Sequence, residues 1–312
     1  MSKERIIFDT DPGIDDALAL LLLATSPEIS LEAITVTHGN TSMSKCLANA
    51  LRIADLVGLG EVPIAAGAIE PLVKELSVAE ETHGDGGLGY AHLPDSTRSV
   101  DSRLAHDLII ELVRRNPGEM TLLCVGPMTN IALALLKAPD IAPMIKRIIA
   151  MGGAIHYPGN ATPQSEYNVF CDPESYDIVL RSGIEFTLVP LDVTYQCLFT
   201  TDHLALMGDV RSDIRTFIAD STRFYMEFHA EYQDIQGCAI NDPLAAALLI
   251  KPDLVKYREY FVEVELRSAT SKAKTIADHF AATGKKPNCR VAMEVDVPAF
   301  MSLFIDRMKR FS

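Results

Sequence analysis

Short apolar runs alternate along the chain with longer stretches whose apolar residues recur at helical spacing. The short runs are rich in β-branched and aromatic residues and predict buried strands; they lie at residues 6–8, 31–37, 62–66, 120–125, 147–151 and 186–191. The helical pattern is clearest at residues 44–57, 102–115 and 131–137. Such alternation indicates βαβ units. We therefore expect one α/β domain over residues 1–312, with an open, mainly parallel sheet and helices on both faces.

Polar residues gather where the predicted strands end. His38-Gly39-Asn40 follows the second strand, residues 126–130 follow the fourth, and Gly152-Gly153 follows the fifth, with Asn160 and Glu166-Tyr167-Asn168 shortly after. In a parallel sheet, ligands bind beyond the carboxyl ends of the strands. Glycine at such positions lets the backbone approach a ligand closely. These segments predict one ligand site at that edge of the sheet.

The turn after the first strand is crowded with carboxylates. Asp9, Asp11, Asp15 and Asp16 flank Pro12-Gly13, which forces a turn before a helix begins. Acids do favour the N-terminus of a helix because of its dipole, but four are more than that effect requires. Their mutual repulsion would raise their pKa values. A hard divalent cation with oxygen ligands, Ca²⁺ or Mg²⁺, would remove the conflict.

Composition narrows the possible partners and compartment. With 28 basic and 42 acidic residues, the formal net charge is −14, which argues against binding to nucleic acid or to an acidic membrane surface. The six cysteines form no Cys-x-x-Cys pair and are expected to be buried free thiols in a reducing compartment. The chain enters its first strand without a signal-peptide pattern, and the apolar residues 18–24 are too few to span a bilayer. We expect a cytoplasmic protein.

Residues 9–17, Asp-Thr-Asp-Pro-Gly-Ile-Asp-Asp-Ala, resemble the signature of the inosine-uridine-preferring nucleoside hydrolases. Further segments similar to motifs of this family follow in family order over most of the chain: Gly39-Asn40 and residues 83–86, 125–130, 151–153, 166–174 and 241–243. An Asp-x-Asp after a first strand also begins the haloacid dehalogenase-like phosphatases, which would release phosphate. That family has no counterpart to the later segments.

The resemblance implies an enzyme that hydrolyses the N-glycosidic bond of ribonucleosides to ribose and free base, with a Ca²⁺-bound water activated by Asp11. The implied Ca²⁺ ligands are Asp11, Asp16, the main-chain carbonyl of Val125, and Asp242. The implied substrate contacts are Asp15, Asn40, Met151, Asn160, Glu166 and Asn168, the last also counted as catalytic because its dipole faces a positive ribose ring. A homo-oligomer, dimer or tetramer, and a role in nucleoside salvage are also implied.

One position departs from the family pattern. Many members have His immediately before the late calcium Asp, where it assists the departing base, and this chain has Asn241. Asn is no acid, although it donates hydrogen bonds. Three hypotheses follow: His83, in a glycine-rich loop, assists the base; His229 does so; or the enzyme uses no acid and prefers bases that leave readily. Phe224 and Tyr225 share the helix of His229 and are predicted to contact the base with it.

Two alternatives to a conventional nucleoside hydrolase also fit the sequence. The same sugar site would also suit an unusual nucleoside or ribosyl conjugate, which Asn241 makes credible. A non-catalytic ribose- or nucleoside-binding protein would also keep the ribose contacts. Asp11 argues against a mere binding protein, because binding alone does not require a general base beside the water.

Overall fold

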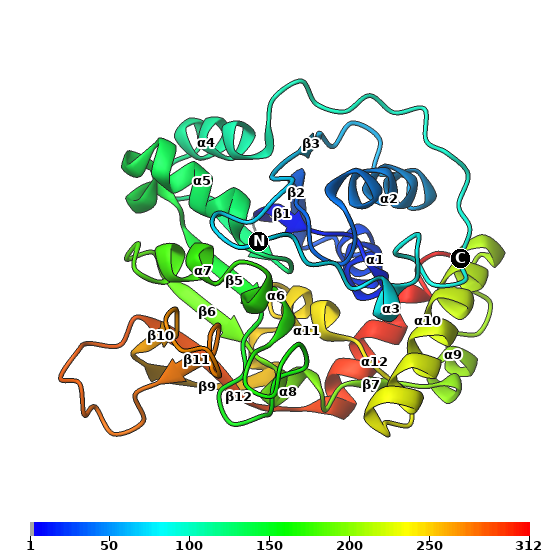
Figure 1. The fold of residues 1–312 in the computed structure, drawn as a ribbon. Coiled ribbons are helices and arrows are strands. Elements are labelled where there is room, and N and C mark those ends of the chain that lie inside the picture. Colours follow the sequence, from blue (N-terminus) through cyan, green and yellow to red (C-terminus); the bar gives the residue numbers. More distant parts are fainter. Residues whose placement is uncertain (1–2) are drawn as a thin grey trace.

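The structure is a computed structural model that describes residues 3–312; Met1 and Ser2 of the expected domain lie outside the described residues. Its main strands are β1 (Glu4–Thr10), β2 (Ile29–Val36), β3 (Ile64–Ala66), β4 (Met120–Cys124), β5 (Arg147–Met151), β6 (Phe186–Val189), β9 (Val255–Tyr260) and β12 (Cys289–Val295). They form one eight-stranded sheet in the order β3-β2-β1-β4-β5-β6-β12-β9 (Figure 1). Every neighbouring pair is parallel except β12 and β9, which are antiparallel. The predicted mainly parallel sheet is confirmed.

β9 and β12 are the two strands of this sheet outside the predicted set. β9 lies at the edge, and its sequence Val-Lys-Tyr-Arg-Glu-Tyr buries only the two end residues. β12 carries Arg290, Glu294 and other partly exposed positions. An edge strand faces water and needs no continuous apolar run. The apolar runs therefore identified the strands in the middle of the sheet and missed those at this end.

Helices cover both faces of the sheet. They are α1 (Ile14–Ala24), α2 (Met43–Leu56), α3 (Glu80–His83), α4 (Ala105–Arg115), α5 (Thr129–Lys137), α6 (Tyr167–Cys171), α7 (Pro173–Leu180), α8 (Leu191–Thr194), α9 (Thr201–Leu206), α10 (Ser212–Gln233), α11 (Asn241–Ala247) and α12 (Val297–Met308), with 3₁₀ turns at Pro139–Met144 and Pro252–Leu254. Short pairs of strands, β7 (Leu198–Phe199) with β8 (Cys238–Ala239) and β10 (Val262–Val264) with β11 (Thr275–Ala277), lie outside the main sheet.

Two hydrophobic cores result, one on each face of the sheet. Alternate residues of β1 point to opposite faces, so Ile6 and Phe8 belong to one core and Ile7 to the other. The first core contains buried residues of α1, α2, α10, α11 and α12, whereas the second contains those of α4, α5 and α7. The predicted arrangement, helices on both faces, is therefore confirmed.

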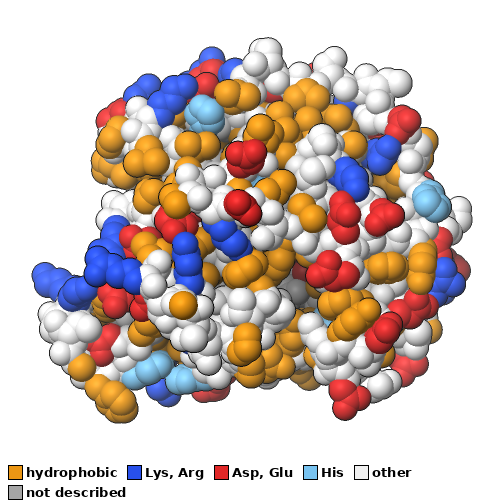
Figure 2. Space-filling view, viewed as in Figure 1, with side chains coloured by type: hydrophobic (Ala, Val, Ile, Leu, Met, Phe, Trp, Pro, Cys, Tyr) orange, Lys and Arg blue, Asp and Glu red, His pale blue; other side chains and the backbone are white. Residues whose placement is uncertain are grey.

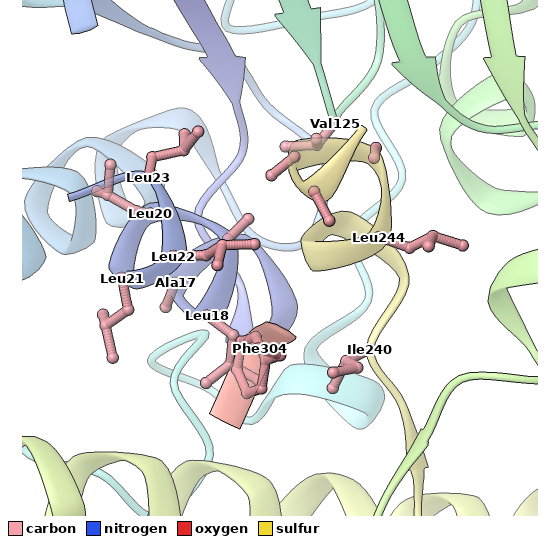
Figure 3. Packing of buried hydrophobic residues seen from close by; sticks show 14 of the residues in the cluster. Ala17, Leu18, Leu20, Leu21, Leu22, Leu23, Val125, Ile240, Leu244 and Phe304 are labelled. Carbon is pink, nitrogen blue, oxygen red and sulfur yellow. The ribbon is translucent and has the colours of Figure 1, made fainter. Parts of the chain in front are cut away.

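Helix α1 is buried on all sides, which explains its apolar sequence. Every residue from Ile14 to Leu23 is buried, and leucine side chains leave the helix in several directions to meet its neighbours (Figure 3). The helix packs against α11, α10, α12 and α2. Within residues 3–312, no helix is both long and apolar enough to cross a membrane. Because neighbours surround α1, the position of its first turn is fixed.

The order of the strands places a crevice at the end of β1. From β1 the chain proceeds outward to β2 and β3, and it then returns to build β4, β5 and β6 on the other side of β1. The connections leave in opposite directions at such a point, so an open parallel sheet binds ligands there, beyond the carboxyl ends of its strands. Asp11 follows β1, and Val125 follows β4. The topology thus brings these two predicted site residues together.

The packing of α1 predicts a large cost for truncating it. Replacing Leu18, which is fully buried, by Ala should lower the free energy of unfolding by about 2–5 kcal/mol, because the transfer energy is lost and a cavity remains. Leu136→Ala, on the exposed side of α5 (58% exposed), is the matched control and should change it by about 0.5 kcal/mol or less. Urea denaturation of both variants measures the difference. Equal costs would contradict the buried position of α1.

Candidate active site

Three carboxylates from two helix N-termini converge beyond the sheet. Asp15 and Asp16 lie in the first turn of α1, and Asp242 lies in the first turn of α11. Each offers an oxygen within 4.8 Å of the others, and all three residues are buried. The N-terminus of a helix attracts negative charge, and α1 packs against α11. Three carboxylates arranged in this way could hold a cation through their oxygen atoms.

Asp11 is held beside this cluster between two glycines. A Cβ atom at Gly39 would lie 2.0 Å from its Oδ2, and one at Gly126 would lie 2.3 Å from its Oδ1, so any larger residue would displace the carboxylate. The backbone N–H of Asn40 donates to Oδ2 at 2.7 Å. Oδ1 is buried and has no hydrogen-bond partner. A buried carboxylate oxygen without a partner is costly, and it indicates a missing ligand.

The charges of the cluster are not balanced by basic side chains. Burial, and next the negative charge of neighbouring carboxylates, raises the pKa values of Asp11 and Asp242 well above the usual range. Burial likewise raises the pKa values of Asp15 and Asp16. Among the described residues, the cavity above the cluster has no Lys or Arg in its lining. Carboxylates and the nearby Val125 carbonyl are hard oxygen donors, so the residues present fit a hard divalent cation.

Asp9, the fourth carboxylate of the turn, is separate from this cluster. Its Oδ2 accepts hydrogen bonds from Thr35 Oγ1 at 2.5 Å and from Asn130 Nδ2 at 2.9 Å. Burial raises its pKa to about 7, although both hydrogen bonds act in the opposite direction. Asp9 thus links β1 to β2 and α5. The sequence grouped it with the other three acids, whereas its side chain is held by Thr35 and Asn130 and takes no part in the cluster.

A cavity opens above the carboxylates, and the surface is hollowed near the centre of this face (Figure 2). Its lining is Asp15, Asn40, Ala79, Thr82, His83, Val125, Met151, Asn160, Glu166, Tyr167, Asn168, Tyr195, Tyr225, Phe228, His229, Gln233, Asn241 and Asp242. All the predicted site residues are in this lining except Asp11 and Asp16, which are buried beside it, and Phe224. The ring of Phe224 instead packs edge-on against Tyr90, with 5.1 Å between centroids. Phe224 is therefore not placed in the site.

Glu166 and Asn168 form one wall of the cavity. The Glu166 carboxylate accepts hydrogen bonds from the backbone N–H groups of Gly153 at 2.7 Å, Asn168 at 2.8 Å and Val169 at 3.1 Å. Burial raises its pKa to about 7, and these N–H groups limit the rise. Asn168 Nδ2 donates to the carbonyl oxygen of Val125 at 2.8 Å. A carbonyl has a second lone pair, so this bond leaves Val125 able to bind a cation.

The amide hydrogens of Asn241 are directed to other groups of the protein and not to the cavity. Its Nδ2 donates to Asp15 Oδ2 at 2.8 Å and lies 3.4 Å from the carbonyl oxygen of Ala239, whereas its Oδ1 is buried without a partner. If the side-chain amide were rotated by 180°, its oxygen would face these two acceptor oxygens, and neither contact would be a hydrogen bond. Asn241 therefore positions Asp15, and the atom left for a ligand is an acceptor. The expectation that this residue could donate to a departing base does not fit that arrangement.

His83 is held in a single tautomer. The backbone N–H of Ile14 donates to its Nδ1 at 3.1 Å, so the ring proton must lie on Nε2. The residue is buried at the end of α3, and burial lowers its pKa to about 4. His83 is consequently a neutral N–H donor at physiological pH. Its position in the cavity lining agrees with the first of the three hypotheses about the leaving base.

His229 has the opposite tautomer. Its Nδ1 lies 2.8 Å from the carbonyl oxygen of Tyr225, which can only accept, so Nδ1 carries the proton. Burial lowers its pKa to about 4, and the ring is neutral. Nε2 is then an acceptor. His229 therefore lines the cavity as predicted but offers no proton from that atom.

Sequence reasoning did not assign four polar residues of the cavity lining to the site: Thr82, Tyr167, Tyr195 and Gln233. Gln233 lies four residues after His229 and eight after Tyr225 on α10, so helical spacing could have found it. Tyr195 follows the short helix α8 and carried no comparable signal. Burial raises its pKa to about 12.

Comparison with known proteins identifies the family of the chain. The model of the family described as inosine-uridine preferring nucleoside hydrolase matches residues 6–302. A pyrimidine-specific ribonucleoside hydrolase RihA from Enterobacter sp. (strain 638) is 36% identical over 308 residues, covering 98% of each chain. The chain therefore belongs to the inosine-uridine preferring nucleoside hydrolase family. The predicted resemblance and the enzyme class, nucleoside N-ribohydrolase, are confirmed.

Solved structures show the same fold. A purine-preferring ribonucleoside hydrolase from Gardnerella vaginalis superimposes with a TM-score of 0.93 at 36% identity, covering 98% of both chains. The plant nucleoside hydrolase PpNRh1 gives a TM-score of 0.92 at 31% identity, covering 98% of this chain and 99% of that one. Two relatives that are each 36% identical thus carry opposite base preferences in their names. Overall similarity does not assign the base, and the local geometry must do so.

Proposed function

We propose that the protein hydrolyses ribonucleosides to ribose and free base at this cavity, with Ca²⁺ bound by Asp11, Asp16, Asp242 and the Val125 carbonyl. The observation that carries the proposal is the unpartnered Oδ1 of Asp11 beside buried carboxylates that no basic side chain of the cavity lining neutralises. Asp15, which lies within the same cluster, binds the ribose hydroxyls. Ca²⁺ suits this site because it accepts many oxygen ligands in a flexible geometry.

The chemistry follows from the charge that develops on the sugar. Cleavage of an N-ribosidic bond gives an oxocarbenium-like ribose, as in other glycoside hydrolysis. A bound divalent cation would orient the ribose diol and make a water molecule more acidic. Asp11 is the general base that takes the proton of that water. Glu166 and Asn168 place negative charge and a carbonyl dipole near the positive ring, and their hydrogen bonds fix them before reaction.

The leaving base gains its assistance from His83. Nε2–H of the neutral ring is a donor, because Ile14 occupies Nδ1, and a hydrogen bond to the base stabilises the negative charge that the base acquires as the bond breaks. His229 is less suited to this role, since its Nδ1 proton is directed to the carbonyl of Tyr225. Asn241 is committed to Asp15. The tautomers of His83 and His229 therefore support the hypothesis that His83 assists the leaving base.

We also propose a homo-oligomer, a dimer or tetramer, in a reducing compartment such as the cytoplasm. Ile69, Val73 and Leu76 are 62%, 71% and 41% exposed, and apolar side chains grouped on one exposed segment are typical of protein interfaces. All six cysteines are buried and free, which suits a reducing environment. Sedimentation velocity would measure the oligomeric state.

Removing the proposed base should abolish turnover without unfolding the protein. For Asp11→Asn, kcat on uridine should fall by at least about 100-fold, because a general base contributes about 10²–10⁴-fold. The exposed Asp209→Asn is the matched control and should keep wild-type kcat. A reducing-sugar assay over a panel of ribonucleosides, with Ca²⁺ and with a chelator, measures both variants and the wild type.

Three results would contradict the proposed function. Near wild-type turnover by Asp11→Asn would exclude it as the base. Turnover that a chelator does not reduce would exclude the cation. Tight binding of ribonucleosides without release of ribose from any of them would identify a binding protein instead.

The role of His83 predicts a split between substrates. His83→Ala should lower kcat for uridine and inosine by about 10–100-fold, since it removes the donor to the base. It should spare p-nitrophenyl riboside, whose nitrophenolate leaves without assistance. Glu81→Gln, in the same short helix, is the control and should alter neither. An equal fall on all three substrates would mean that His83 is structural, because it also caps Ile14.

A further inference from the structure

One wall of the cavity presents a row of hydrogen-bond acceptors. It is formed by Tyr225, His229 and Gln233, which lie at intervals of four residues on α10, and by Asn241 at the start of α11. The four residues form a continuous row: Asn241 Nδ2 lies 3.3 Å from the Tyr225 hydroxyl, and the rings of Tyr225 and His229 meet edge-on with 4.4 Å between centroids. Gln233 continues the row one helical turn further.

Three of the four polar residues of this wall, Asn241, Tyr225 and His229, direct their hydrogens to other groups of the protein. The amide hydrogens of Asn241 are directed to Asp15 and to the carbonyl of Ala239. The Tyr225 hydroxyl faces Asp15 Oδ2 at 3.5 Å. His229 holds its proton on Nδ1, and its pKa, lowered to about 4 by burial, keeps the ring neutral.

Two acceptor atoms of the wall are buried without any partner. Asn241 Oδ1 and Gln233 Oε1 each lack a hydrogen bond in the described structure. Leaving a buried acceptor unpaired is unfavourable, and a ligand that supplies a donor removes that penalty. His229 Nε2 is a third acceptor on the same wall. These atoms define what a ligand must present: N–H groups, and more than one of them.

We propose that the wall of Tyr225, His229, Gln233 and Asn241 recognises the exocyclic amino group of the base, so that the enzyme prefers amino-substituted bases to their oxo counterparts. This inference rests on the proposed function and specifies its substrate. An amino group offers two N–H donors to the row of acceptors. An oxo group at the same place would set lone pairs against lone pairs, and the single ring N–H beside it could satisfy only one of the acceptors.

A residue next to this wall completes the selection. The ring of His83 is a neighbour of the Tyr225 ring, with 5.4 Å between centroids, and His83 supplies a donor through Nε2. A base with an acceptor near its glycosidic nitrogen and an amino group at its far edge satisfies both His83 and the wall. Cytosine has O2 and a 4-amino group; adenine has N3 and a 6-amino group. Uracil and hypoxanthine present oxo groups at the far edge.

The test compares matched pairs of substrates. With Ca²⁺ present, kcat/KM should be about 10–100-fold higher for cytidine than for uridine, and higher for adenosine than for inosine, from the cost of an unpaired buried acceptor. The riboside of pyrimidin-2-one lacks the amino group of cytidine and adds no bulk in its place. Its kcat/KM should be lower than that of cytidine by a similar factor. Wild-type ratios at or below one, or a pyrimidin-2-one riboside as good as cytidine, would overturn the proposal.

Cytosine and uracil also differ in how readily they leave, and variants separate this difference from recognition. The leaving tendency of each base is the same for every variant, so it cancels when the cytidine-to-uridine ratio of kcat/KM in a variant is divided by the ratio in the wild type. Gln233→Met and His229→Leu keep approximate volume and remove an acceptor, so each should reduce the cytidine-to-uridine ratio by about 5-fold or more. Gln233→Glu retains acceptor oxygens and should preserve the preference. The exposed Glu231→Gln, on the same helix, should leave the ratio unchanged. Unchanged ratios in both Gln233→Met and His229→Leu would overturn the proposal.

Failure of the proposed hydrolysis is distinguishable from failure of this preference. If the wild-type protein releases no ribose from any substrate, hydrolysis is excluded, and calorimetric dissociation constants of cytidine and uridine in Ca²⁺ then decide the base preference directly. Tighter binding of cytidine, lost in Gln233→Met, would support the acceptor wall. Equal binding would refute it.

Discussion

The fold places carboxylates where they repel one another and where water does not screen them. Asp11, Asp15, Asp16 and Asp242 are all buried, and burial together with the charge of the neighbours raises the pKa values of Asp11, Asp16 and Asp242. Ionising such a group requires a positive partner. The described cavity lining has no Lys or Arg, so a cation from solution is the partner that the family chemistry supplies. The rest of the site is organised around this electrostatic conflict.

The fold holds these carboxylates close together and prevents them from moving apart. Helix α1 is surrounded by other helices, so its first turn cannot move away from that of α11. Glycines at positions 39 and 126 leave Asp11 just enough room between two strand ends. Hydrogen bonds from Thr10, Gly13 and Asn40 fix both oxygens of Asp16. A preorganised site of this kind binds a cation and a transition state without first having to rearrange.

Much of the fold and the carboxylate site could be predicted because the signals are local. Apolar runs marked the central strands, and the acids near Pro12-Gly13 are contiguous in sequence. Directions of hydrogen bonds were not predictable in this way. Asn241 donates to Asp15 across 226 residues, and Ile14 donates to His83 across 69. These long-range contacts decide which atoms face the base, and they convert Asn241 from a possible donor to an acceptor.

Helical periodicity explains the remaining differences. Phe224 and Tyr225 are adjacent in sequence, but neighbouring residues of a helix point about 100° apart, so only Tyr225 reaches the cavity. Gln233 shares the face of Tyr225 and His229. The first core covers one side of α10 through Ile214 and Phe217, which fixes the rotation of the helix. A sequence pattern gives the face of a helix, whereas packing decides what that face meets.

Calcium binding tests the central claim most directly. Titration calorimetry of chelator-treated wild-type protein should show one Ca²⁺ per chain, with a rise in the midpoint of thermal unfolding. Asp242→Asn should lose the binding and the rise, while its metal-free form is at least as stable as metal-free wild type because one repulsive carboxylate is gone. Asp209→Asn should bind as wild type does. No Ca²⁺ binding by the wild type, or undiminished binding by Asp242→Asn, would contradict the account.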